Sequence, residues 1–598
     1  MSIHQRLKSL AKFIDNNIIL ILGGFLIAFI PLYPKIPLFS PIEEYIVRVR
    51  LEDIFILITV IIWAVQVFRK KIKIHPTFFK LITGYGVIGL LSVLSAIFII
   101  KTVPIESIHI GKTLLHYFRY LEYFSLFFVL YSAIKSKKDV QKILTILILT
   151  TFAIALYGFG QRYYYWPVYS TMNREFSKGI VLYLTEHARV QSTFAGHYDL
   201  AAWLVIVLPI ILTIAFKTKE KVIKIIAHLA HWLGLWLLIE SAARSSFAAY
   251  IVAVTVVVLL LSLQRKKILN KIFYFLIRYL FIGTTVLITM IYFGGSMAER
   301  LLQVVESYPQ VAQSYDYIDE KRVALIDNTF GKVFQNALPQ ANKPNNGLST
   351  DEAVQIIVSS DTRPVTQKPD DLNIKDRPSD VYVDVPDYIK VATISATGET
   401  SFVTVERERT YSDNALKYGL SLAIRLDTLW PQAIKGFYRS PLLGSGYATL
   451  NKGNLYLFTE ADGVDNNFLR TLGETGLLGI ISFYGTIFFA MRLAIKSLRN
   501  HQDELLKIFA IGYFAGSLGL LINATYIDVY AASKVAFSYW AITGVFVAYY
   551  TIIENKTKLT KDFVIKKSTI LDKKKTNSNR KQLTFKNSTT PKKRRKKS

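Results

Sequence analysis

Long apolar runs constrain this chain more than any other feature of its sequence. Such runs recur along most of its 598 residues, and only 19% of the residues are charged. A helix needs about 20 mainly apolar residues to cross a hydrocarbon core of about 30 Å. A soluble chain of this length would instead divide into several domains with polar surfaces. The sequence therefore predicts an all-α polytopic membrane protein.

The apolar runs predict twelve transmembrane helices. The first run is too long for a signal peptide and lacks a small-residue cleavage site, so we expect it to remain as an anchor. The expected spans cover residues 16–33, 54–68, 79–100, 113–134, 142–161, 198–216, 223–241, 245–263, 272–293, 469–491, 507–526 and 534–553.

Lysine and arginine residues in the connections predict the orientation of the chain. With the N-terminus inside, the N-terminal segment and the inner connections carry 24 such residues, whereas the short outer connections carry 11. Because cytoplasmic loops carry the excess of positive charge, we expect both termini in the cytoplasm. The expected organisation is helices 1–9 within residues 1–293, an extracytoplasmic loop domain at 294–468, helices 10–12 within 469–553, and a basic, disordered cytoplasmic tail at 554–598.

About half of the net charge of +29 lies in that tail, because residues 555–598 hold 17 Lys and Arg against 2 Asp. A basic tail is compatible with binding of nucleic acid or anionic lipid. A solvated tail beside an anionic membrane leaflet is the favoured interpretation, so no nucleic-acid partner is predicted. The chain has no cysteine, which excludes disulfides, thiol nucleophiles and thiolate metal sites.

The connection at 294–468 is unlike the others. Up to Asp465 it holds 23 acidic and 17 basic residues, and it is too long to be a simple connector. We expect a mixed α/β loop domain that covers a site, with a helical segment at 297–334, a β-hairpin at 381–405 and an amphipathic stretch at 415–438 along the membrane surface. Three aspartates, Asp380, Asp384 and Asp387, cluster in the solvated hairpin, and no metal site is predicted from them.

Four polar patterns fall at the predicted outer ends of spans, although none of them was used to assign the orientation. Their convergence on one side of the membrane predicts an active site that faces outside. In order along the chain they are RVQSTFAGHYDLAAW at 189–203, SAARSS at 241–246, RLDTLWPQAIKGFYRSPLLGSG at 425–446, and DNNFLRTLGETGLLG at 465–479.

Several charged residues in these regions also have purely structural interpretations. Arg189 can snorkel to the interface, and Asp465 can cap the helix that follows it. Arg244 lies in a short outer turn, against the positive-inside rule, which favours a polar or anionic partner. Arg119 and Glu122, three residues apart within the fourth span, are expected mainly to form a structural ion pair.

The ordered set of four patterns resembles that of the O-antigen ligase and polymerase superfamily of bacterial membrane glycosyltransferases. The resemblance covers roughly residues 110–550 and includes about twelve spans with a large outer loop late in the chain. The first pattern resembles the Arg-then-Ser/Thr-Phe motif, the second the Ser-Arg turn, and the third the Arg-x-x-x-x-Trp…Pro-x-x-Gly-x-Gly segment. In the fourth pattern, Asp465 stands where ligases commonly carry a histidine and many relatives an aspartate.

This resemblance implies transfer of a glycan from a polyprenyl diphosphate carrier, such as undecaprenyl diphosphate, to an acceptor hydroxyl. The reaction would take place on the outer, periplasmic face of the cytoplasmic membrane during synthesis of cell-envelope polysaccharide such as lipopolysaccharide. The acceptor would be a glycan, a lipid or a protein, so ligase, polymerase and protein O-oligosaccharyltransferase all remain open. A polysaccharide or lipid transporter is the non-enzymatic alternative, although the sequence shows no clear inverted repeat.

The chemistry of that reaction suits the residue types in the four patterns. Negative charge grows on the leaving diphosphate, and arginine guanidinium groups stabilise it through bidentate hydrogen bonds. Diphosphate is already a good leaving group, so no metal or cofactor is required. The expected catalytic residues are Asp465, Arg189 and Arg244, and the expected substrate-binding residues are Arg425, His197, Asp199, Asn466, Arg470 and Glu474.

Overall fold

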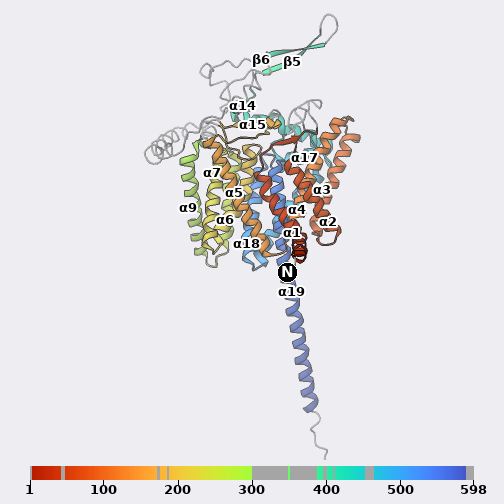
Figure 1. Cartoon of the computed structure of the whole chain (residues 1–598), viewed down its shortest axis with the longest axis vertical. Helices are drawn as coiled ribbons and strands as arrows, with labels where there is room; N and C mark the ends of the chain where they lie inside the picture. Colours follow the sequence, from red (N-terminus) through yellow and green to blue (C-terminus); the bar gives the residue numbers. More distant parts are fainter. Residues whose placement is uncertain are drawn as a thin grey trace, which may run out of the picture.

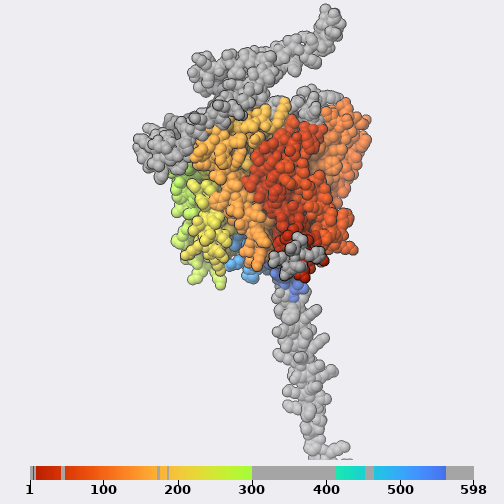
Figure 2. All heavy atoms as spheres, viewed as in Figure 1, coloured from red at the N-terminus to blue at the C-terminus, as the bar shows by residue number. Residues whose placement is uncertain are grey.

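Helices form most of the described chain and pack into a single bundle (Figure 1). On the face seen in Figure 2, the N-terminal helix (red) packs beside the helix at Lys137–Tyr164 (orange). The computed structural model describes residues 3–41, 48–171, 176–184, 188–295, 297–298, 348–349, 387–394, 400–407, 411–450 and 463–586.

Eleven helices in these ranges are long and apolar enough to cross a membrane, so this is a multi-pass membrane protein. They coincide with eleven of the twelve expected spans. They are α1 (Ile3–Leu32), α2 (Leu51–Phe68), α3 (Pro76–Leu94, continued by a π-turn to Ile99), α5 (Lys137–Tyr164), α6 (His197–Lys217), α7 (Lys221–Glu240), α8 (Arg244–Leu263), α9 (Ile268–Phe293), α17 (Asn467–Asn500), α18 (Glu504–Asn523) and α19 (Ser533–Lys586).

Helix α4 (Ser107–Ala133) lies where the remaining span was expected, and it packs within the bundle against α19. It is less apolar than the eleven because it carries charged residues, including Arg119 and Glu122. The ion pair expected between these two is present, with Arg119 Nη1 at 2.8 Å from Glu122 Oε2. The same nitrogen also lies 2.7 Å from Asp53 Oδ1 on α2, so its charge is balanced by carboxylates inside the protein.

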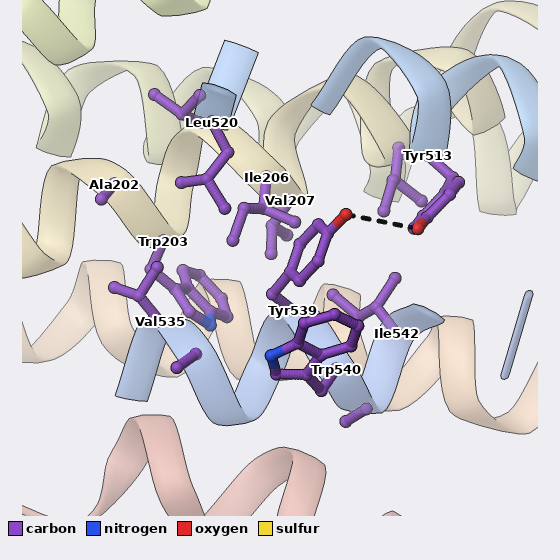
Figure 3. Close-up of a cluster of buried hydrophobic side chains, with 14 of the residues drawn as sticks. Ala202, Trp203, Ile206, Val207, Tyr513, Leu520, Val535, Tyr539, Trp540 and Ile542 are labelled. Carbon is purple, nitrogen blue, oxygen red and sulfur yellow. Dashed lines mark hydrogen bonds between the residues drawn. The ribbon is translucent and has the colours of Figure 1, made fainter. Parts of the chain in front are cut away.

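Helix α6 is the central helix of the bundle. In its most apolar 18-residue segment, 94% of the residues are buried, against 11% for α9, which lies at the edge of the bundle. Figure 3 shows Trp203 and Ile206 of α6 facing Tyr539 and Trp540 of α19. The Tyr539 hydroxyl also lies 3.4 Å from the hydroxyl of Tyr513 on α18. Three helices thus share one buried aromatic layer.

Glycines of α18 allow it to approach α6 closely. A Cβ atom at Gly512 would lie 2.5 Å from Ile210 Cα, and one at Gly516 would lie 2.6 Å from the carbonyl oxygen of Ile206. Lipid tails are as apolar as leucine, so helices in a membrane associate mainly through close packing of this kind. The contact between α6 and α18 therefore fixes the middle of the bundle.

The bundle has two ends that differ in what they carry. The N-terminus and the extended part of α19 leave from one end, the terminal end (Figure 1). Residues 413–424 lie at the opposite end, the loop end (Figure 1). The third polar pattern follows directly, and hydrogen bonds join the other three to it, so all four polar patterns lie at the loop end.

The connection between α9 and α17 is described in part. The expected hairpin is present as antiparallel strands β5 (Asp387–Ile394) and β6 (Thr400–Arg407). The expected amphipathic stretch is a series of short helices, whereas residues 299–334, Asp380 and Asp384 lie outside the described residues. The short helices are α14 (Asp413–Tyr418), α15 (Leu420–Ile424), a π-turn (Arg425–Leu429) and α16 (Trp430–Arg439), and the remaining short strands are β1 (Pro37–Phe39), β2 (Val49–Arg50), β3 (Leu182–Tyr183) and β4 (Leu348–Ser349).

The described part of the basic tail, residues 554–586, is helical rather than disordered as expected. Helix α19 continues without interruption to Lys586, which makes it 54 residues long. The expectation rested on charge alone, but residues 554–586 contain neither proline nor glycine, the two strongest helix breakers.

Helix α17 is broken at Gly476, where the backbone takes φ 65° and ψ −164°. Lipid offers no partners to the backbone groups that such a break exposes. The end of the third pattern, residues 441–446, supplies them by pairing with both sides of the break. The N–H groups of Leu477, Leu478, Ser445 and Gly446 donate to the carbonyls of Pro441, Leu442, Gly473 and Glu474, at 2.9, 3.2, 2.8 and 3.0 Å.

The Gly476→Ala variant is expected to be destabilised. The new Cβ would lie 2.4 Å from the carbonyl carbon of Leu442, in a left-handed conformation that alanine avoids. Strain of this kind costs about 1–3 kcal/mol, so the melting temperature of the purified full-length protein in detergent should fall. Gly485→Ala is the matched control in the same helix, because nothing lies within 4 Å of a Cβ added there. Equal melting temperatures for the two variants would contradict the need for glycine at the break.

Candidate functional site

A cavity of about 420 Å³ lies at the loop end, between the connection that precedes α2 and helices α4, α6, α17 and α19. Aromatic and small side chains form part of its wall, and charged groups from five segments of the chain meet in it. These charged lining residues are Lys35, Arg50, Arg119, Arg470, Asp199, Asp465 and Asp528.

The cavity brings together three of the nine site residues expected from sequence, namely Asp199, Asp465 and Arg470. Two more contact these lining residues directly. Arg425 Nη2 lies 2.9 Å from Asp465 Oδ2, and Glu474 Oε1 lies 3.4 Å from Arg470 Nε. The buried Glu474 carboxylate also accepts the backbone N–H of Ala448 at 3.2 Å.

Arg189 and His197 lie beside the cavity rather than in its lining. The Arg189 guanidinium donates to His197 Nε2, and it also donates to the hydroxyl of Tyr198 at 3.4 Å. Tyr198 lines the cavity, so this pair stands at its edge. Arg244 is the first residue of α8, half-buried and outside the lining. The structure therefore does not bring Arg244 into the cavity.

Hydrogen bonds join the patterns to one another. The backbone N–H of Val190 in the first pattern donates to the carbonyl of Glu240, directly before the second, at 3.3 Å. Ser246 of the second pattern accepts from Asn523 Nδ2, at the end of α18, at 2.9 Å. The next residue, Ala524, accepts the backbone N–H of Asn467 in the fourth pattern at 2.8 Å. The four patterns therefore form one continuous structure at the loop end.

Asp528, between α18 and α19, holds the turn that carries Asp465. Its carboxylate accepts the backbone N–H groups of Val464, Asp465 and Asn466 at 2.8, 3.2 and 3.1 Å. It also lies 3.1 Å from Arg470 Nη1. Asp465 takes a left-handed φ of 55° in this turn, and three successive N–H bonds hold it there. No local sequence signal singles out Asp528, because its partners lie some 60 residues earlier.

Asn466, and not Asp465, caps helix α17. Asn466 Oδ1 accepts the backbone N–H of Leu469 at 3.0 Å, so the interpretation of Asp465 as the cap is wrong. Two asparagines follow Asp465, and spacing alone does not say which of the three residues begins the helix. Instead, Asp465 pairs with Arg425, whose buried guanidinium stacks over the ring of Tyr526 at 4.1 Å. Arg425 thereby orients the Asp465 carboxylate at the cavity.

Three cations at the loop end, Lys35, Arg50 and Lys534, were counted only as residues of outer connections. All are buried, with exposed fractions of 2%, 9% and 1%. Lys35 Nζ donates to Glu52 Oε1 at 2.5 Å and to Ser533 Oγ at 2.6 Å. Burial lowers the pKa of Lys35, and the Glu52 carboxylate opposes that shift. The sequence singles these three cations out in one way: they lie on the side of the membrane that disfavours positive charge. Such a position is unfavourable unless the protein supplies partners.

The fold and cavity define a class of protein: a polytopic membrane protein with a charged cavity at one end of its helix bundle. Neither a comparison with protein-family models nor one with curated proteins finds a match for this chain. The charges in the cavity and the four sequence patterns are therefore the features that bear on its activity.

Asp528→Asn is expected to lower the melting temperature of the detergent-solubilised protein. Asparagine offers one acceptor oxygen in place of two and removes the charge opposite the buried Arg470. Breaking a buried ion pair costs up to about 3–5 kcal/mol, and the second partner of Arg470, Glu474, should reduce that loss. The control is Asp427→Asn, because Asp427 is a solvated carboxylate bonded to Ser412 and Asn414. A shift no larger than that of the control would argue against the turn-holding role.

Proposed function

We propose that this protein is a membrane glycosyltransferase resembling O-antigen ligase, which moves a glycan from a polyprenyl diphosphate to an acceptor hydroxyl. The observation that carries the proposal is the meeting of four cations with three carboxylates in one cavity at the end of a membrane bundle. The cations are Lys35, Arg50, Arg119 and Arg470, and the carboxylates are Asp199, Asp465 and Asp528.

The cations support a diphosphate donor. As the bond between the sugar and the diphosphate breaks, negative charge grows on the leaving oxygen, and fixed guanidinium groups stabilise it. Hydrogen bonds to charged groups contribute about 1.5–3 kcal/mol each. A cavity at the end of the bundle also suits a lipid carrier, because the headgroup can reach the charges while the polyprenyl chain stays in the bilayer.

Asp465 supports activation of the acceptor. In the proposed step, the acceptor oxygen forms a bond to the anomeric carbon while the bond from that carbon to the diphosphate breaks. The hydroxyl proton passes to the Asp465 carboxylate, and the lipid diphosphate leaves. Arg425 and Asp528 act as positioning residues for Asp465, because one contacts its carboxylate and the other its backbone.

The other expected arginines have different relations to this step. Arg189 stands at the edge of the cavity beside Tyr198, where it is placed to meet the donor as it enters. Arg244 lies outside the lining, so we assign the diphosphate to the cavity cations rather than to Arg244. The acceptor class remains open among glycan, lipid and protein. A transporter would also bind the donor, but it would not release lipid diphosphate.

We also propose that the loop end faces outside the cytoplasmic membrane, in keeping with the lysine and arginine bias. Single cysteines at Ser349 and Ser578 are a clean test, since the native chain has none. An impermeant thiol reagent applied to intact cells should label the Ser349→Cys protein and spare Ser578→Cys. Permeabilised cells, in which both should react, are the control. The reverse pattern would overturn the orientation.

Transfer is testable by reconstituting the protein with a lipid-diphosphate oligosaccharide and glycan, lipid or protein acceptors. The wild-type protein should release lipid diphosphate and extend one acceptor. Asp465→Asn should still fold, and it should lose turnover by about 100-fold or more, because a general base contributes about 10²–10⁴-fold. Asp427→Asn, a solvated carboxylate of the same loop, is the control. No release with any acceptor would contradict the proposed reaction, and near-normal turnover of Asp465→Asn would contradict only the base.

A further inference from the structure

Two charged side chains in the cavity lining differ from the rest. The other five are engaged: Lys35 with Glu52, Arg119 with Asp53 and Glu122, Asp465 with Arg425, and Arg470 with Asp528 and Glu474. Within the part of the chain that the structure describes, neither Arg50 nor Asp199 forms a side-chain ion pair or hydrogen bond, even with each other. Arg50 is nine-tenths buried, and its Nε has no hydrogen-bond partner.

Among the described residues, no acid forms an ion pair or hydrogen bond with the Arg50 guanidinium. Glu52 uses Oε1 to bind the ammonium of Lys35, and its Oε2 has no hydrogen-bond partner. Asp53 uses Oδ1 to bind Arg119 and Oδ2 to accept the backbone N–H of Arg50 itself. The Arg50 guanidinium is therefore left facing the cavity with donors to spare.

Lys534 directly follows Ser533, which lines the cavity, and every hydrogen-bond donor of its ammonium group is used. Its ammonium has three protons, and it lies 3.0, 2.6 and 2.7 Å from the carbonyl oxygens of Pro31, Tyr33 and Thr193. No proton remains for Asp199, in the first turn of α6. Its carboxylate is left facing the cavity with acceptors to spare.

Unpartnered charges inside a protein are costly, and buried polar groups nearly always have partners. A guanidinium and a carboxylate that share a cavity without pairing are best satisfied by one ligand with an anionic end and a hydroxyl-bearing end. The volume of about 420 Å³ is in the usual range for a small-molecule site. A sugar joined to a phosphate has both ends.

We propose that Arg50 and Asp199 form one phosphosugar subsite. Arg50 binds a phosphate oxygen of the lipid-linked diphosphate, and Asp199 accepts hydrogen bonds from hydroxyl groups of the sugar attached to it. This inference rests on the proposed function and adds to it the residues that recognise the first sugar of the donor.

Direct binding tests the subsite without any transfer reaction. Farnesyl diphosphate and the same lipid diphosphate carrying a single hexose would be titrated against the purified full-length protein in detergent. Arg50→Gln should weaken binding of both ligands by about tenfold or more, since it removes a charged hydrogen bond. Asp199→Asn should weaken binding of the hexose-bearing ligand alone, by about five- to tenfold.

The matched control is Arg48→Gln. Arg48 is two residues away and half-buried, but it lies outside the cavity lining and its Nε donates to Ser177 Oγ at 3.3 Å. It should bind both ligands like the wild type. Neither Arg50→Gln nor Asp199→Asn should lower the melting temperature of the ligand-free protein, because each removes a charge that has no side-chain partner among the described residues. A lower melting temperature together with equal loss of both ligands would mean a structural role and overturn the subsite.

The outcomes separate this inference from the proposed function. If the wild-type protein binds neither ligand, the proposed function fails. If it binds both and the two variants bind like the wild type, only the subsite is wrong. Inorganic pyrophosphate should compete poorly, and competition as strong as that of farnesyl diphosphate would contradict a lipid-linked occupant.

Discussion

The loop end depends on one constraint: where helices in a membrane bundle end or break, buried protein groups must replace water as hydrogen-bond partners. Two residues of opposite charge in one short stretch meet much of this need. Asp528 accepts three successive N–H groups ahead of α17, and Lys534 faces carbonyls at the end of α1 and in the first pattern. The stretch at 524–534 therefore holds the first and fourth patterns in place, although they are some 270 residues apart in sequence.

The cavity follows from that arrangement. Ala531, Ala532 and Ser533 lie between the two anchoring residues and line the cavity with little volume of their own. The carbonyl of Ala531 also accepts the hydroxyl of Tyr123, which ties the stretch to α4 at 3.0 Å. Large side chains at these three positions would fill part of the cavity. Small residues flanked by Asp528 and Lys534, whose charges are satisfied within the protein, thus keep the cavity open.

Sequence patterns predicted the elements of this fold better than their contacts. Apolar runs located eleven spans and α4, and alternation located the β5–β6 hairpin, because both signals are local. The spacing of Arg119 and Glu122 predicted their pair, but it carried no information about Asp53 on another helix. In the same way, nothing near Arg425 indicates that it contacts Asp465. Contacts of this kind depend on packing between segments that are far apart in the chain.

Cations that contradict the positive-inside rule indicate the position of the cavity, which the four sequence patterns alone do not give. Four of the eleven outer cations, Lys35, Arg50, Lys112 and Lys534, are buried, whereas no described cation of the inner connections is. Once these four are set aside, seven outer cations remain against 24 inner ones, so the positive-inside bias is stronger than the raw count suggests. Two of the four, Lys35 and Arg50, line the cavity, and Lys534 anchors the segments that form it. A cation on the unfavourable side of a membrane protein is retained only where the protein or a ligand offsets its cost, and for two of these four that place is the cavity.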